Sequence, residues 1–345
     1  MQSSRPRLSP AIADVRRAVR NSLAPVATDH ADGLVLVALS GGPDSLALAA
    51  ATAFEASRAG LRAGAVVVDH QLQKHSADVA AIAAFQAEVL GLDPVITRRV
   101  DVGTDGGPEA AARTARYAAL DAVAAETGAV AVLLGHTLDD QAETVLLGLA
   151  RGSGATSLHG MAAEGGLYRR PLLGIRRSST EQFCADSKLE PWLDPHNDDE
   201  SYTRVRVRAT VLPVLEAELG PGIADALART ADQLREDADA LDHFAEEIAE
   251  DFAQIVEAGI ALPVSALAAQ PAALRQRLIR LVVSSEFHLS LSRTQTLEVA
   301  RLVTDWHGQK PLDLPGVRVE RRSGLIVFAA STVGELTGQD PVLEH

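Results

Sequence analysis

Short apolar runs alternate with alanine-rich stretches along the first half of the chain. Four of these runs have the length and character of buried strands, namely Leu34 to Leu39, Ala63 to Asp69, Pro94 to Val100 and Val130 to Gly135. The stretches between them have the length of crossover helices and lie near Ser45 to Arg58, Ala77 to Leu90 and Glu109 to Thr127. This alternation is typical of a parallel sheet covered on both faces. We therefore expect a doubly wound, mainly parallel α/β fold, preceded by an amphipathic helix from Ala11 to Leu23.

The pattern changes after Gly165, where no regular period continues. We interpret residues 165–219 as a connecting and binding segment with a short helix near Thr180 to Ser187. A long acidic helical stretch follows, and after it come two helices and a β-like pair, near Ala272 to Ser285, Ser292 to Thr304 and Leu312 to Phe328. The sequence thus predicts a first domain over residues 1–219, a smaller and mainly α-helical domain over residues 220–335, and a tail over residues 336–345.

The length of 345 residues agrees with two domains, and 47% hydrophobic and 23% charged residues are the proportions of a globular protein. No apolar run approaches the roughly 18 residues that a bilayer span needs, so we expect no membrane protein. The first residues lack the order of a secretory signal, and a cytoplasmic location is the default expectation. Cys184 is the only cysteine, which excludes an internal disulfide and a metal cluster held by cysteines alone. The oligomeric state is open, and a homodimer is compatible with the sequence.

The formal net charge of −14 argues against a protein that coats nucleic acid through a broad cationic face. The charge is uneven, because acidic residues crowd the stretch from Glu216 to Glu257 and arginines gather before it. Nearly all positive charge is arginine, since only Lys74, Lys188 and Lys310 are lysines. Arginine suits phosphate recognition, but GC-rich codon usage gives the same bias, and composition alone favours neither explanation.

The hexapeptide SGGPDS, Ser40 to Ser45, lies between an apolar strand and a helix with an apolar period. Consecutive glycines let backbone N–H groups converge on an anion, and the following helix adds its positive end, so a phosphate is the expected ligand. The loop lacks the lysine of a Walker A sequence. Asp44 instead offers a carboxylate beside the anion, which suits a Mg²⁺ ion that bridges phosphates. An ordinary strand-to-helix turn is the alternative, and the context of all six residues favours phosphate binding.

A second motif, GHTLDDQAETVLLGLARGSG, begins directly after the fourth expected strand. On a helix, Asp139, Asp140 and Glu143 share one neighbourhood, where their charges repel one another. A metal ion or an ammonium group would relieve this repulsion. Capping by Thr137 and the helix dipole explain Asp140 well and Glu143 poorly. We therefore favour a functional role for the three carboxylates.

Two arginine groups follow less specific patterns. Helical spacing in GGPEAAARTARY places Arg113 and Arg116 on one face, where they suit a phosphate, but an ion pair between Glu109 and Arg113 is an equal alternative. In DPHNDDESYTRVRVRATVLP, helical spacing would stack Arg204 over Arg208, and strand spacing would also align Arg206 with them. Either makes a basic stripe, for which phosphate binding and pairing with nearby aspartates are equal alternatives.

SGGPDS resembles the signature of the PP-loop ATP pyrophosphatases, which implies their nucleotide-binding α/β fold and cleavage of ATP to AMP and pyrophosphate. A more specific pattern runs from Leu34 to Pro213 and continues, more weakly, at LPGVRVERRSG. HTLDDQAETVLLGLARGSG, RPLL and DPHNDD with the arginines after it, in this order, resemble the tRNA(Ile)-lysidine synthetase family. The resemblance implies ATP-dependent ligation of L-lysine to C2 of the wobble cytidine in the CAU-anticodon isoleucine tRNA, through an adenylated cytidine.

The resemblance also implies roles for the motif residues. ATP would bind at Ser40, Gly41, Gly42, Pro43, Asp44 and Ser45, with Mg²⁺ on Asp44. The catalytic candidates are Asp44, Arg113, Asp139, Asp140 and Glu143, of which the last three would hold the lysine ammonium group and accept its proton. We expect tRNA phosphates at Arg204, Arg206 and Arg208, and selection of the correct tRNA by the domain over residues 220–335.

Two other functions compete with this one. Another PP-loop reaction, tRNA thiolation, needs paired cysteines or an iron–sulfur cluster, whereas Cys184 is alone. A binding module that has kept the loop and lost catalysis is disfavoured, because all the carboxylates of both motifs are intact.

Overall fold

The computed structural model describes residues 8–71, 75–103, 107–152, 155–194, 199–257 and 259–331. The chain forms two compact units, which divide between Leu234 and Arg235. Part of the DPHNDD motif and the expected tail over residues 336–345 lie outside the described residues. Each unit has its own sheet and its own apolar core, and each is described separately below.

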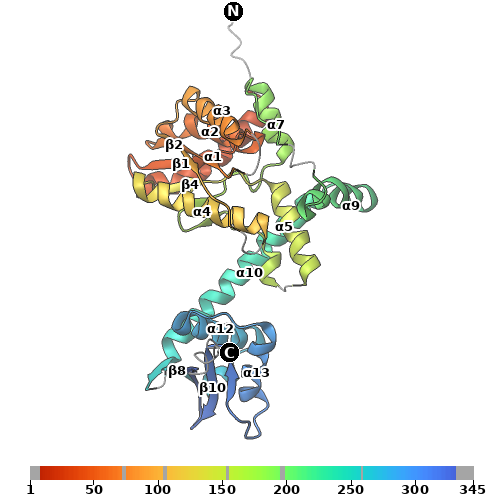
Figure 1. Ribbon diagram of the computed structural model, residues 1–345. Helices are drawn as coiled ribbons and strands as arrows, with labels where there is room; N and C mark the ends of the chain where they lie inside the picture. The colour runs from red at the N-terminus through yellow and green to blue at the C-terminus, as the bar shows by residue number, and fades with distance from the viewer. Residues whose placement is uncertain are drawn as a thin grey trace, which may run out of the picture. The chain divides into compact units, whose positions relative to one another are not determined.

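The first unit is built on a six-stranded sheet with the order β3-β2-β1-β4-β6-β5 (Figure 1). The strands are β1 (Leu34–Ala38), β2 (Arg62–Asp69), β3 (Val95–Arg99), β4 (Ala131–Leu133), β5 (Glu164–Gly165) and β6 (Tyr168–Arg169). All neighbouring strands are parallel except β5 and β6, which form a short antiparallel hairpin. The expectation of a mainly parallel sheet is confirmed, and the sequence analysis missed only the two-residue strands β5 and β6.

Helices cover both faces of this sheet, because the side chains of β1 alternate between two apolar cores. Val35 and Val37 pack under α1 (Pro10–Asp29), α2 (Pro43–Arg58), α3 (Ser76–Val89) and α7 (Arg177–Asp186). Leu34, Leu36 and Ala38 face the other side, where α4 (Pro108–Thr127) packs. Burial on both faces explains why β1 is apolar at every position.

The remaining helices of the first unit follow β4 in the chain. They are α5 (Leu138–Arg151), α6 (Ala155–Leu158), α8 (Thr203–Arg206), a π-helix η2 (Val207–Val211), α9 (Leu212–Leu219) and the first part of α10 (Ile223–Phe252). A small apolar core joins α5, η2, α9 and α10 through Leu138, Ala142, Val207, Leu212 and Ala228. This core fixes the arginine-rich segment against the second sequence motif.

The second unit contains a five-stranded antiparallel sheet with the order β7-β8-β11-β10-β9. Its strands are β7 (Gln254–Val256), β8 (Gly259–Pro263), β9 (Leu312–Leu314), β10 (Val317–Arg322) and β11 (Leu325–Ala330), and its helices are α11 (Val264–Ala269), α12 (Ala272–Phe287) and α13 (Arg293–Thr304). The expectation of a mainly helical domain was therefore wrong. The strands β7 and β8 follow directly on a long acidic helix. The strand β8 pairs with β7 on one side and on the other with β11, far along the chain, as at Leu262 with Ile326.

Among the residues that the structure describes, no helix combines the length and the apolar character that a membrane span needs.

One buried acid ties the first helix to the rest of the first unit. Glu55 on α2 is 2% exposed, and its carboxylate accepts hydrogen bonds from Nε of Arg16 at 2.9 Å and from Nε of Arg20 at 2.8 Å. Burial alone would raise the pKa of Glu55, but the bonds and charges of Arg20 and Arg16 outweigh it and hold this pKa below its usual value. The ionised carboxylate is therefore the form that stabilises the α1–α2 contact.

We predict that Glu55→Gln lowers the free energy of unfolding by roughly 1.5–3 kcal/mol at pH 7, the usual worth of a hydrogen bond to a charged group. The pKa of Glu55 is lower in the folded than in the unfolded chain, so its contribution is complete above about pH 4.3, the ordinary pKa of glutamate. The contribution disappears as the pH falls through the lower folded-state pKa. Urea unfolding of both proteins between pH 3 and pH 7 would measure the difference, and a constant difference across this range would contradict the prediction.

Candidate functional site

The two sequence motifs meet at the carboxyl end of the sheet. The strand β1 lies between β2 and β4, so the connections after β1 and after β4 leave the sheet in opposite directions and open a crevice between them. Gly135, just after β4, lies against the SGGPDS loop: a Cβ atom there would stand 3.1 Å from the backbone nitrogen of Ser45. A glycine is needed at this contact because any side chain would push the two loops apart.

The loop from Ser40 to Ser45, here called the phosphate loop, is held in shape by its own hydroxyl groups. The Ser45 hydroxyl accepts the Ser40 backbone N–H at 3.1 Å and donates to the Gly42 carbonyl at 3.0 Å. Gly41 has a φ of +84°, which only glycine adopts without strain, and Pro43 begins α2. No side chain caps α2, so its positive end faces the loop and is available to an anion.

A pocket with a volume of about 190 Å³ adjoins the phosphate loop and runs along the ends of β1 and β2. Its lining is largely apolar, with Val66, Val68 and the Trp192 side chain beside Ser40. Arg116 from α4 is the one arginine or lysine among the described lining residues. The size and composition suit a nucleoside next to the phosphates.

Arg116 is half-buried at this pocket and has no compensating acid in the described part of the chain. Burial lowers the pKa of its guanidinium, as does the charge of Arg113, and no carboxylate in the described part of the chain forms an ion pair with Arg116. The neighbouring Arg113, which the sequence analysis placed in the catalytic set, lies exposed with its guanidinium 4.9 Å from the centre of the Tyr117 ring. An anion in the pocket would stabilise Arg116, because an uncompensated charge partly withdrawn from water is costly.

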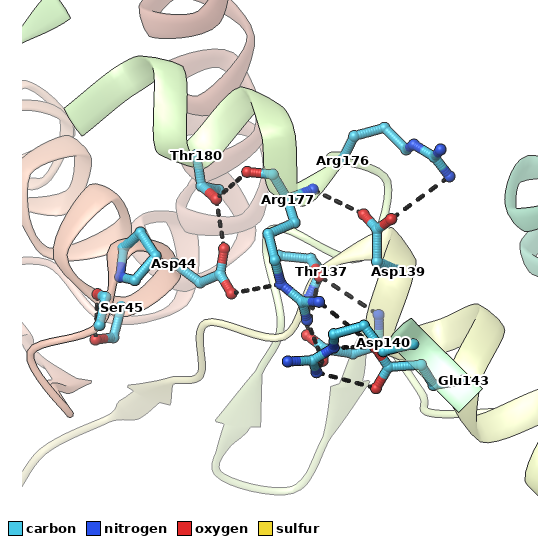
Figure 2. A network of polar contacts seen from close by, with 12 residues as sticks. Asp44, Ser45, Thr137, Asp139, Asp140, Glu143, Arg176, Arg177 and Thr180 are labelled. Atoms are coloured by element: carbon cyan, nitrogen blue, oxygen red, sulfur yellow. Dashed lines mark hydrogen bonds and ion pairs between the residues drawn. The ribbon is translucent and has the colours of Figure 1, made fainter. Parts of the chain in front are cut away.

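Arg177, the first residue of α7, contacts all four candidate carboxylates (Figure 2). Its backbone N–H donates to Asp139 at 2.7 Å. Its guanidinium donates to Asp140 at 2.7 Å, Asp44 at 3.3 Å and Glu143 at 3.5 Å. One arginine thus joins the phosphate loop to the carboxylates of α5.

The three carboxylates of α5 differ in their surroundings. Asp140 closes a capping box with Thr137, whose backbone N–H it accepts at 2.8 Å. Burial would raise the pKa of Asp140, but Arg177 and the bonds from Thr137 outweigh it and lower this pKa. Glu143 lies deeper, with a fully buried side chain. Asp139 is at the surface and pairs with Arg176 at 3.6 Å.

Two arginines of the basic stripe point into this carboxylate cluster. Arg208 donates two hydrogen bonds to Glu143, from Nε at 2.7 Å and from Nη2 at 3.1 Å. Arg204 approaches the same carboxylate, with Nε 3.3 Å from Oε2. Arg206 points away and donates to the backbone carbonyls of Glu200 and Ser201. The segment is helical, so Arg204 and Arg208 share a face that Arg206 does not, and Glu143, an acid the sequence analysis did not consider as their partner, pairs with both.

Three arginines therefore balance the three inner carboxylates: Arg177, Arg204 and Arg208 face Asp44, Asp140 and Glu143. Arg176 is shared by Asp139 and Asp225, at 3.6 and 3.7 Å. The sequence analysis expected a metal ion or an ammonium group to relieve the repulsion among the carboxylates. In the structure guanidinium groups from three other segments relieve it. His136 adds no charge near pH 7, because burial lowers its pKa to about 3.

Asp44 is placed to serve a metal beside the phosphate loop. Burial raises its pKa, as does the charge of Asp140, and the bonds from the Thr180 hydroxyl and from Arg177 offset this only in part. No group of three metal-ligating side chains occurs among the described residues, so most ligands of a Mg²⁺ ion would be phosphate oxygens and water. A hard carboxylate oxygen beside a phosphate-binding loop fits this ion.

The sequence analysis missed Arg177, Thr180 and Trp192, which all come from the irregular segment after Gly165. Thr180 is fully buried and donates to Asp44 and, at 2.7 Å, to the carbonyl of Arg177. The backbone N–H of Trp192 donates to the Gly41 carbonyl at 2.9 Å. The only signal in the sequence was the group of arginines in YRRPLLGIRR, which does not indicate the carboxylates as partners.

Two family models match the chain. A model described as the PP-loop domain matches residues 14–215, and one described as the TilS substrate binding domain matches residues 262–325. Among solved structures, the chain is similar to the U34-tRNA thiolase NcsA from Methanococcus maripaludis with its 4Fe–4S cluster, with a TM-score of 0.54 and 20% identity, covering 66% of this chain and 80% of that one. At that identity the similarity shows the fold alone.

Curated relatives are much closer in sequence. The chain is 65% identical over 300 residues to the tRNA(Ile)-lysidine synthase of Leifsonia xyli subsp. xyli (strain CTCB07), covering 87% of this chain and 90% of the relative. It is 53% identical over 324 residues to the tRNA(Ile)-lysidine synthase of Thermobifida fusca (strain YX), covering 93% of this chain and 98% of the relative. With nearly full coverage of both relatives and a matching model for each of its two units, the chain belongs to the tRNA(Ile)-lysidine synthase family.

Proposed function

We propose that this chain ligates free L-lysine to C2 of the wobble cytidine in the CAU-anticodon isoleucine tRNA, and that ATP is converted to AMP and pyrophosphate. The observation that carries the proposal is the contact between the phosphate loop and the carboxylates of α5 through Arg177 (Figure 2). A site that activates a base with ATP and then receives an amine needs a phosphate cradle and carboxylates at one place, and these motifs supply both.

ATP binds with its phosphates on the phosphate loop and its nucleoside in the adjoining pocket. The uncapped start of α2 and the half-buried guanidinium of Arg116, which has no acid partner in the described structure, both favour negative charge there. Bound on Asp44, Mg²⁺ would offset the charge of the departing pyrophosphate. Arg116 is placed to stabilise phosphate charge from the opposite wall of the pocket, and Arg113 stays a candidate on the outer face of α4.

In the first step, the carbonyl oxygen at C2 of the cytidine attacks the α-phosphorus, the bond to pyrophosphate breaks, and C2 becomes electrophilic. In the second, the ε-amine of lysine attacks C2, the new C–N bond forms and AMP leaves. Asp139, Asp140 and Glu143 hold the ammonium group and take the proton that it must lose before it attacks. Residues 262–325 of the second unit, which match the substrate-binding model, contribute to tRNA binding.

The thiolase alternative finds no support in this site. Cys184 is buried on α7, its thiol donates to the Pro43 carbonyl at 3.5 Å, and burial raises its pKa to about 12. A thiol in that state is neither a nucleophile nor a cluster ligand at neutral pH. Cys184 therefore contributes to the packing of α7 beside the phosphate loop.

Isotope exchange between ATP and pyrophosphate, with each substrate omitted in turn, tests the proposed function. We expect exchange that requires the isoleucine tRNA and does not require lysine, because the base is activated before lysine reacts. Lysine would then convert the tRNA to its lysidine form, measured by mass spectrometry of the nucleosides. Exchange that depends on lysine and not on tRNA would mean that an amino acid is activated instead.

We predict that Asp44→Asn lowers the rate of lysidine formation by at least about 100-fold, the usual cost of removing a group that stabilises transition-state charge. The fold should persist, because asparagine fills the same volume and can still accept the Thr180 hydroxyl. Cys184→Ser, which also touches the loop, is the matched control and should change the rate by less than about tenfold. Near-normal activity of Asp44→Asn at saturating Mg²⁺ would remove Asp44 from the mechanism.

We predict that Arg116→Gln raises the KM for ATP by about 10- to 100-fold, in line with 1.5–3 kcal/mol for a hydrogen bond to a charged group. Stability should not fall, because the variant removes a half-buried charge that has no acid partner in the described structure. Arg113→Gln, at the exposed position one turn earlier, should have the smaller effect on this KM. The opposite order of the two effects would place the phosphates on the outer face of α4.

A further inference from the structure

The Glu143 carboxylate has no oxygen left for a substrate. Oε1 accepts Nε of Arg208 at 2.7 Å and lies 3.5 Å from Nη1 of Arg177. Oε2 accepts Nη2 of Arg208 at 3.1 Å and lies 3.3 Å from Nε of Arg204. The side chain is fully buried, so solvent does not share these contacts. An ammonium group can bind Glu143 only by replacing a guanidinium.

The charge balance leads to the same conclusion. The inner carboxylates Asp44, Asp140 and Glu143 already face three arginines, so a further cation gains little while all three stay in place. A lysine ammonium is attracted only after one of these arginines has moved to another anion. The departing guanidinium must be compensated as well, because an unpaired charge is costly wherever water is excluded.

The structure distinguishes the arginines that can leave from the one that cannot. Arg177 begins a helix anchored in the core by Thr180, Phe183 and Cys184, and its side chain is 18% exposed. Arg204 and Arg208 reach in from the surface, with side chains 31% and 30% exposed. Arg208 also lies on the π-helix η2, a turn that is rare and often found at functional sites.

We propose that Arg204 and Arg208 occupy the lysine site of the free protein and leave it for phosphates of the bound tRNA, so that lysine binds Glu143 in exchange. This inference rests on the proposed function. Phosphate suits a departing guanidinium, because it accepts the same two-pronged hydrogen bonds as a carboxylate. The exchange conserves charge: Glu143 stays paired with a cation, and each arginine stays paired with an anion.

The exchange makes lysine binding depend on tRNA, and by linkage lysine must tighten tRNA binding by the same factor. Couplings of this kind usually change an affinity by about 5- to 150-fold. Free lysine, which is present in any cell, would then bind only weakly before the cytidine is in place. Arg208 is in this sense a positioning residue that decides when the amine enters.

The test is the dissociation constant of L-lysine, measured by calorimetry on the full chain without ATP, so that no turnover occurs. For the unmodified protein we expect the constant to fall by at least about fivefold when the isoleucine tRNA is added. For Arg208→Ala we expect lysine to bind about tenfold more tightly than to the unmodified protein when tRNA is absent, and tRNA to add little more. This variant should fold, because Glu143 keeps Arg177 and Arg204.

Arg62→Ala is the control, because Arg62 begins β2 at the end of the sheet opposite the site and its guanidinium donates to the Asp32 carbonyl, so lysine binding should stay unchanged. Glu143→Gln should weaken lysine binding with and without tRNA. Equal or weaker lysine binding by Arg208→Ala without tRNA, or full coupling to tRNA in that variant, would overturn the exchange. Pyrophosphate exchange that needs tRNA but not lysine would still support the proposed function in that case, and its absence would overturn the function itself.

Discussion

The site depends on the pairing of carboxylates and arginines away from water. A buried ionised carboxylate costs several kcal/mol unless a cation and hydrogen bonds compensate it, and Glu143, Asp140 and Asp44 are all largely withdrawn from solvent. The compensating arginines come from α7 and from α8 with η2, which lie far from α2 and α5 in sequence. The carboxylates can therefore be assembled only when these elements have docked, so the chemistry of the site and the tertiary fold form together.

Arg177 differs from the other arginines of the site because it contacts all four candidate carboxylates. A guanidinium has five donors in a planar fork, and here its side chain reaches three acids on two helices while its backbone N–H holds a fourth acid. Burial and the charge of Asp140 still raise the pKa of Asp44 despite the nearby guanidinium. Arg177 contacts Asp44 at 3.3 Å and is shared with other acids. Asp44 can therefore bind a metal ion at a lower cost than a carboxylate with an arginine of its own.

The sequence predicted the parts of the molecule that local chemistry determines. The strands β1 and β2 are apolar because both faces of the sheet are covered, and the phosphate loop carries its glycines, proline and serines within six residues. Partners could not be predicted where they depend on docking. Nothing near Arg208 in the sequence indicates Glu143, and Arg177 follows a segment without a period. In the second sheet the β-like pair near Leu312 to Phe328 was predicted, whereas β7 and β8 were missed for the same reason, since β8 also depends on pairing with β11, far along the chain.

The same constraint bears on how a chain with a formal net charge of −14 can bind a polyanion. Its arginines before the acidic helix form a basic stripe in the sequence, yet two of them, Arg204 and Arg208, form ion pairs with Glu143 in the folded protein. With these two guanidinium groups paired to Glu143, fewer cations of the stripe are available to phosphates that meet the surface at random, so less counterion release supports nonspecific binding. In the proposed exchange, Arg204 and Arg208 become available to phosphates only when they leave Glu143. They would then add affinity only for an RNA that brings its phosphates to this place. Acidic character and selective tRNA binding are then two results of one arrangement of charge.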